Sequence, residues 1–118
     1  MDFDLNNSIP IWKQLTSQLK ERIASGDYKA GDKFPSVRDL AAEAGVNPNT
    51  MQRAMALLET EGLVITNRTV GRTVTADESI INQTRNDLAK ERTQKYLREM
   101  QALGYDTEDA IKMLKDGK

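Results

Sequence analysis

The chain of 118 residues contains no cysteine and no histidine. These absences exclude disulfide bonds, zinc sites built from thiolates and imidazoles, a cysteine nucleophile and a histidine general base. No stretch approaches the ~18 apolar residues that a transmembrane helix requires. The N-terminal residues MDFDLNNS are acidic and polar, without the basic and apolar regions of a signal peptide. We therefore expect a cytoplasmic protein without a membrane partner, a bound metal or a cofactor.

The sequence also lacks the usual signatures of an enzyme. It has no glycine-rich phosphate loop and no paired carboxylates at a catalytic spacing. Its length supports one compact domain plus an appendage, which is less chain than most catalytic domains use. We therefore predict no catalytic residues.

The order of helix-starting and helix-ending residues between positions 35 and 75 is the most informative feature that is present. Ser36 can cap a first helix, with Asp39 three residues later in its first turn. Gly45 suits the left-handed position at which such a helix ends. Asn47 is a preferred cap, so it predicts that a second helix starts almost immediately.

This second helix is predicted to begin at Pro48, because a proline at the first helical position has no N–H group to leave unpaired. Gly62 is predicted to close it, and a short β-hairpin follows. Two short helices joined by a tight turn, with a hairpin behind them, form a winged helix-turn-helix, which presents its second helix to the DNA major groove. The predicted fold class is mainly α with a small β-hairpin.

Apolar spacing extends this domain toward the N-terminus. An amphipathic helix is predicted over residues 8–25, with Trp12 packed at the domain surface. We assign residues 1–76 to the winged helix-turn-helix domain. The residues expected to share its core are Ile11, Leu15, Leu19, Ile23, Val37, Leu40, Ala41, Val46, Met51, Ala54, Met55, Leu58, Leu63, Val64, Ile65 and Val74.

Residues 77–118 cannot form a core alone. They are predicted to form a helix over 79–103 and a shorter one over 108–115, capped by Thr107. Two helices cannot cover their own apolar stripes, so a second copy of the chain is the natural cover, and a two-fold dimer is the simplest arrangement. The predicted dimerisation residues are Leu88, Tyr96, Leu97, Met100, Leu103, Ile111 and Leu114.

Residues 9–64 resemble the DNA-binding domain of GntR-family transcriptional regulators through the blocks PSVR, GVNPNT and LETEGLV. The stretch LGYDTEDAI at 103–111 is similar to the YtrA branch of that family. The resemblance implies a homodimer joined through the C-terminal helices, a palindromic double-stranded operator and repression of a nearby operon, often one that encodes an ABC transporter. We name no small-molecule effector, because two helices enclose no obvious pocket.

The resemblance also implies that Arg38, in the PSVR block, contacts DNA. A guanidinium at this position can bind a phosphate or pair with guanine through two hydrogen bonds. The alternative is a surface arginine that pairs with Asp39 or Glu43.

The start of the second helix supplies further candidates. Asn47, Asn49 and Thr50 lie where exposed N–H groups and the helix dipole favour phosphate. For Asn47 the alternative is a plain helix cap. One turn later, Gln52 suits adenine and Arg53 suits a phosphate or a base.

The hairpin completes the candidate set. Gly71 allows a positive φ and a close backbone approach, while Arg68 and Arg72 can bind phosphates. Lys33, just ahead of the helix-turn-helix, is a weaker phosphate candidate. The alternative for the hairpin arginines is that they are solvated surface charges.

The charge distribution permits DNA binding without requiring it. The net charge is −1, but residues 33–53 carry one net positive charge and the hairpin tip adds more. We therefore expect weak, salt-sensitive binding to non-specific DNA. The competing hypothesis is a winged-helix module that docks on another protein and does not bind DNA.

Overall fold

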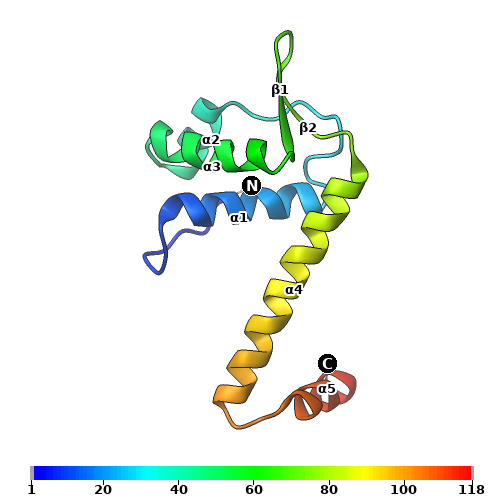
Figure 1. Ribbon diagram of the computed structural model, residues 1–118. Coiled ribbons are helices and arrows are strands. Elements are labelled where there is room, and N and C mark those ends of the chain that lie inside the picture. Colours follow the sequence, from blue (N-terminus) through cyan, green and yellow to red (C-terminus); the bar gives the residue numbers. More distant parts are fainter. Residues whose placement is uncertain (1, 118) are drawn as a thin grey trace. The chain divides into compact units, whose positions relative to one another are not determined.

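The computed structural model describes residues 2–117, which form a helical protein with one hairpin (Figure 1). The predicted fold class is confirmed. The chain divides into two compact units, one ending at Arg85 and the other starting at Asn86. In chain order the elements are α1 (Ile11–Ala24), α2 (Val37–Ala44), α3 (Pro48–Thr60), β1 (Val64–Asn67), β2 (Gly71–Val74), α4 (Glu78–Ala102) and α5 (Thr107–Asp116).

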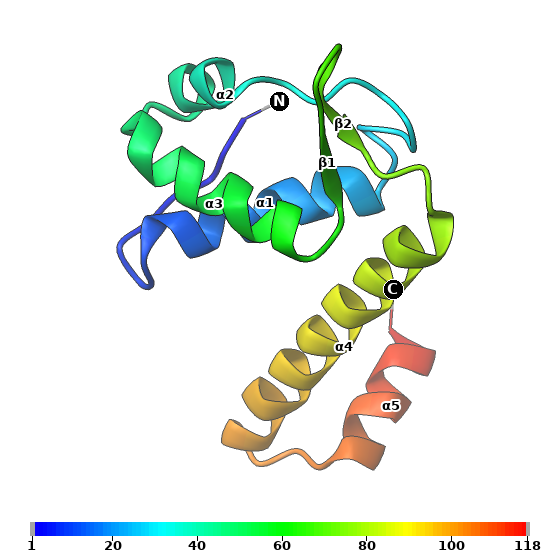
Figure 2. The same ribbon diagram turned by 45° about the horizontal axis from the view of Figure 1, so that its top comes forward.

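The core of the first unit lies where α3 packs against both α1 and α2, as Figure 2 shows. Most of the predicted core residues are buried, whereas Ile11, Val37 and Val46 are only partly buried. The prediction for Ile65 was wrong, since this side chain is 46% exposed. Successive strand residues point to opposite faces, so burial of Val64 turns Ile65 outward. The largest of the fully buried side chains are Leu15, Leu19, Ile23, Leu40, Met51, Met55, Leu58, Leu63, Val64 and Val74.

Local hydrogen bonds fix the ends of α2 and α3 as predicted. The Asp39 amide donates to Ser36 Oγ at 3.0 Å, and the Asn49 amide donates to Asn47 Oδ1 at 2.7 Å. Between the two helices, Gly45 adopts the left-handed conformation with φ of 69°. Each cap uses atoms within three residues, so the turn between the helices is specified locally.

The first helix begins later than predicted. Its first residue is Ile11, preceded by Pro10 in an extended conformation, so residues 8–10 are not helical. The proline disfavours helical geometry at Ile9, because its ring clashes with the backbone of the residue before it.

The hairpin pairs β1 with β2 in antiparallel register, from Val64 opposite Val74 to Asn67 opposite Gly71. A further antiparallel bridge joins Lys33 to Thr73. The segment leading into α2 is therefore attached to β2, which lies between this segment and β1.

The first two turns of α4 belong to the first unit, which thus extends beyond the domain end predicted at residue 76. Ile81 is buried in the core cluster. Arg85 donates two hydrogen bonds to the Ala24 carbonyl, from Nε at 3.0 Å and from Nη2 at 2.8 Å. A side chain of α4 thereby satisfies a carbonyl at the end of α1.

The second unit consists of the remainder of α4 and of α5. The prediction that Thr107 caps α5 was wrong: the cap is Asp106, whose Oδ1 accepts from the Asp109 amide at 2.8 Å. Asp109 accepts from the Asp106 amide in return, at 3.1 Å. This reciprocal pairing satisfies two N–H groups at Asp106 and Asp109. The helix therefore begins at Thr107, one residue after its cap. Within residues 2–117, no helix is both long and apolar enough to cross a membrane.

Candidate nucleic-acid interface

The outward face of α3 carries the central predicted contacts. Residues three and four positions apart share a helix face, so Asn49, Gln52 and Arg53 lie together, and all three are exposed. Thr50 is half-buried at the flank of this face. Burial of the opposite side in the core holds α3 in place. The amide and guanidinium groups on the outward face of α3 are therefore accessible to a partner while the other face stays packed in the core.

Asn47 caps the start of α3, which was the alternative to a contact with DNA. Its side-chain oxygen accepts the Asn49 amide, and this bond fixes the first turn of α3. The backbone N–H groups of this turn are directed away from the helix body, where an anion would be favoured by the dipole. A direct contact of Asn47 with DNA stays a prediction.

Arg38 lies exposed near the start of α2. The alternative, an ion pair with Asp39 or Glu43, is not what the structure shows. Glu43 binds Arg22 instead, at 2.7 Å, and within residues 2–117 Arg38 takes part in no salt bridge. Among the described residues, the Arg38 guanidinium is thus exposed and has no carboxylate partner.

Arg22 is a buried charge that the sequence did not reveal. Burial alone would lower the pKa of Arg22, but hydrogen bonds donated to Glu43 and to the Tyr28 hydroxyl raise it above its ordinary value. The guanidinium also lies 4.1 Å from the centre of the Phe3 ring. Arg22 therefore joins α1 to α2 through Glu43.

The hairpin tip combines a glycine, Gly71, with an exposed arginine, Arg68. Gly71 has φ of +88°, a conformation that other residues rarely adopt. The Asn67 side chain accepts the Thr69 amide at 2.9 Å and closes the turn. Arg68 is exposed at this tip, and among residues 2–117 no salt bridge involves it.

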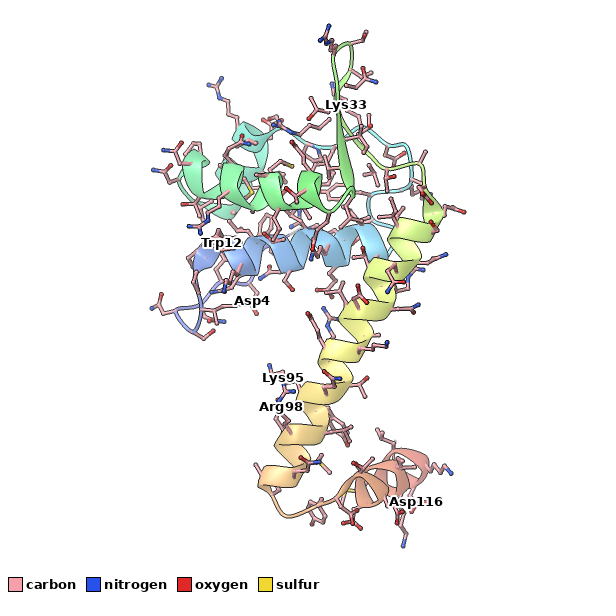
Figure 3. The ribbon with its side chains drawn as sticks, viewed as in Figure 1. Asp4, Trp12, Lys33, Lys95, Arg98 and Asp116 are labelled. Atoms are coloured by element: carbon pink, nitrogen blue, oxygen red, sulfur yellow. The ribbon has the colours of Figure 1, made fainter. Side chains whose placement is uncertain are left out.

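Arg72 differs from Arg68 because it already has a carboxylate partner. Its Nε donates to Glu59 of α3, so this ion pair joins the hairpin to α3. The strand pairing also brings Lys33 beside this hairpin, where Figure 3 labels it. We expect Arg72 to contribute less to phosphate binding than Arg68 does.

Arg53 makes a contact that no local signal indicated. Its guanidinium carbon lies 4.2 Å from the centre of the Trp12 ring, on α1. Trp12 is half-buried at the domain surface, as predicted, and Figure 3 shows it at the start of α1 on the side toward α3. Lys13 Nζ lies 5.7 Å from the same ring centre.

Comparison with known proteins agrees with this geometry. Residues 12–74 match the family described as "Bacterial regulatory proteins, gntR family". The HTH-type transcriptional regulator YhcF of Bacillus subtilis is 32% identical over 115 residues, which cover 98% of this chain and 95% of YhcF. The HTH-type transcriptional repressor YtrA, also of Bacillus subtilis, is 44% identical over 58% of this chain and 52% of its own length.

A solved structure extends the likeness over the whole fold. A GntR family transcriptional regulator from Listeria monocytogenes has 40% sequence identity and a TM-score of 0.86, with 97% of this chain and all of the other covered. The match thus includes the helices that follow the winged domain. The chain belongs to the gntR family of bacterial regulatory proteins and is a transcriptional regulator with a DNA-binding winged helix-turn-helix domain.

Proposed function

We propose that the protein is a homodimeric cytoplasmic repressor that binds a palindromic operator, in a nearby operon such as one for an ABC transporter. The observation that carries this proposal is the exposed face of α3, where Asn49, Gln52 and Arg53 lie on a helix anchored by a buried core. Asn47, Thr50 and Arg38 extend this surface on the helix-turn-helix. Arg68 and Gly71, with smaller contributions from Lys33 and Arg72, extend it on the hairpin.

The dimer part of the proposal rests on the second unit. Of the residues predicted for dimerisation, Leu103, Ile111 and Leu114 are exposed, while Leu88, Tyr96, Leu97 and Met100 are half-buried. Tyr105 and Met113 add exposed apolar surface that was not in the predicted set. Exposed apolar side chains in such number support an interface between protein chains. In the dimer, α3 of each protomer would act as the recognition helix. The two would enter successive major grooves about 34 Å apart and block polymerase.

The test is selection of bound duplexes from a random pool, followed by titration of the selected duplex and a scrambled duplex at two salt concentrations. We expect an inverted repeat, bound at least 1,000-fold more tightly than the scramble. Binding should weaken steeply with salt, because phosphate contacts release counterions.

Two results would overturn the proposal. A selected sequence without two-fold symmetry would contradict the dimeric operator complex. The second is a wild type that binds no DNA and behaves like Arg38→Ala and Asn49→Ala. It would favour the competing hypothesis that the winged domain docks on a protein.

A further inference from the structure

The contact between Trp12 and Arg53 joins two elements with different roles. Arg53 belongs to the outward face of α3, one turn after Asn49, whereas Trp12 lies in the first turn of α1. The guanidinium carbon is 4.2 Å from the ring centre, well inside the range of about 6 Å for a cation–π interaction. The pair therefore couples α1 to the recognition helix at the protein surface.

Stacking leaves the hydrogen-bonding capacity of Arg53 unused. A guanidinium over an aromatic face still directs its N–H groups outward in its own plane, where they match the geometry of a phosphate. Within residues 2–117, no salt bridge involves Arg53. Arg53 is thus a charge held in place without a carboxylate that would have to be displaced.

The ring also restricts a side chain that would otherwise be mobile. An exposed arginine samples many rotamers and loses that freedom when it binds, which weakens the contact. A ring that holds the guanidinium in advance reduces this loss. Lys13, beside the same ring, adds a second positive charge to this edge of the domain.

We propose that Trp12 is a positioning residue that holds Arg53 against a phosphate of the DNA backbone, at the edge of the groove that α3 enters. The inference rests on the proposed DNA binding through α3 and extends the contact surface onto α1. It assigns Arg53 to the phosphate backbone, not to a base. Arg53 therefore contributes affinity and orientation but no sequence preference.

The experiment is a double-mutant cycle on the full-length chain, with Arg53→Gln, Trp12→Leu and the double variant. The probes are the duplex selected from the random pool and its scramble, titrated over a range of salt concentrations. Arg53→Gln should weaken binding to both duplexes by roughly tenfold. It should also reduce the slope of log K against log salt by about 1 for each protomer bound.

Trp12→Leu is expected to weaken binding about two- to fivefold and to leave the salt slope unchanged, because the charge of Arg53 remains. In the Arg53→Gln background, the same substitution should have no further effect. A purely structural role of Trp12 would instead weaken binding equally in both backgrounds, and that result would overturn the inference. Trp12→Phe retains an aromatic face and should recover most of the affinity.

Arg98→Gln on α4 is the matched control, since it removes the same charge outside the first unit. It should leave the affinity and the salt slope unchanged. Trp12 is the one tryptophan of the chain, so its fluorescence reports on the stack directly. Addition of the selected duplex should change the emission of the wild type and not that of Arg53→Gln, a readout that does not depend on how Trp12→Leu folds.

The outcomes separate this inference from the proposed function. Tight binding of the wild type to the selected duplex, with an unchanged salt slope in Arg53→Gln, would overturn the role of the pair and leave the repressor proposal intact. A weaker response to Arg53→Gln on the scramble than on the selected duplex would show a base contact and would also overturn it. If the wild type bound neither duplex, both proposals would fail.

Discussion

The two compact units of the chain use their apolar residues in opposite ways. In the first unit, large side chains from three helices and the hairpin are fully buried against one another. In the second unit, the one buried residue among those described is Ala110, while Leu103 and Leu114 are 74% and 65% exposed. Burial of apolar surface is the main force that stabilises a fold. We infer that the first unit carries its own stability and that the second depends on a further chain.

The difference in burial between the two units is tested most directly by making the same substitution in each unit. Leu19→Ala removes a fully buried side chain and should lower the free energy of unfolding by about 3 kcal/mol. Leu114→Ala should change it by less than about 0.5 kcal/mol at protein concentrations too low for assembly. Urea unfolding followed by circular dichroism measures both. Equal losses in the two variants at such concentrations would show that Leu114 is buried within its own chain.

The next prediction concerns assembly. Leu103→Lys and Leu114→Lys each place a charge on the exposed apolar surface of the second unit and should weaken the dimer by roughly 100-fold. Sedimentation equilibrium over a range of concentrations measures this change. Gln101→Lys adds the same charge at an exposed polar position and serves as the control. A wild-type chain that remained monomeric at every concentration would contradict the dimer itself.

A smaller effect distinguishes the helix caps of the two units. Ser36→Ala removes the acceptor for the Asp39 amide and should cost about 1 kcal/mol of the stability of the first unit. Asp106→Ala breaks the reciprocal cap of α5 and should leave the unfolding of the first unit unchanged. Hydrogen exchange of individual amides resolves the two responses. A similar decrease in amide protection in the helices of both units, caused by either variant, would mean that the units unfold as one.

The smallest prediction concerns the carboxylate that precedes α4. Hydrogen bonds from the Ser79 hydroxyl and amide lower the pKa of Asp77 below its ordinary value of 3.8. Its stabilising contribution is therefore present above about pH 4 and is lost as the pH falls through the lowered pKa. Asp77→Asn should melt at a slightly lower temperature than the wild type at pH 7, with the difference closing below about pH 4. A difference that widened on acidification would contradict this assignment.

Local chemistry was predictable from the sequence, and contacts between distant residues were not. Ser36, Gly45 and Asn47 act within a few residues of themselves, so their order was enough to predict the turn between α2 and α3. By contrast, Arg22 has its carboxylate partner 21 residues away, which no spacing rule selects. The pairing of Arg72 with Glu59 was missed for the same reason.

The errors in the predicted elements have equally specific causes. Ile65 was assigned to the core from its apolar character alone, although strand alternation turns it outward once Val64 is buried. Thr107 and Asp106 are both acceptable caps, and the reciprocal bond with Asp109 decides between them. For the candidate site, helix position predicted which residues of α3 face outward. The contact of Arg53 with Trp12 could not be predicted, because it depends on how α1 packs against α3.

The two hydrogen bonds from Arg85 to the Ala24 carbonyl join residues 61 positions apart. Closing so long a loop is entropically costly, so this contact is expected to form late, after the rate-limiting step of folding. Interactions absent from the transition state act on the unfolding rate and leave the folding rate almost unchanged. Loss of the Arg85 side chain is therefore expected to speed unfolding of the winged domain more than it slows its folding.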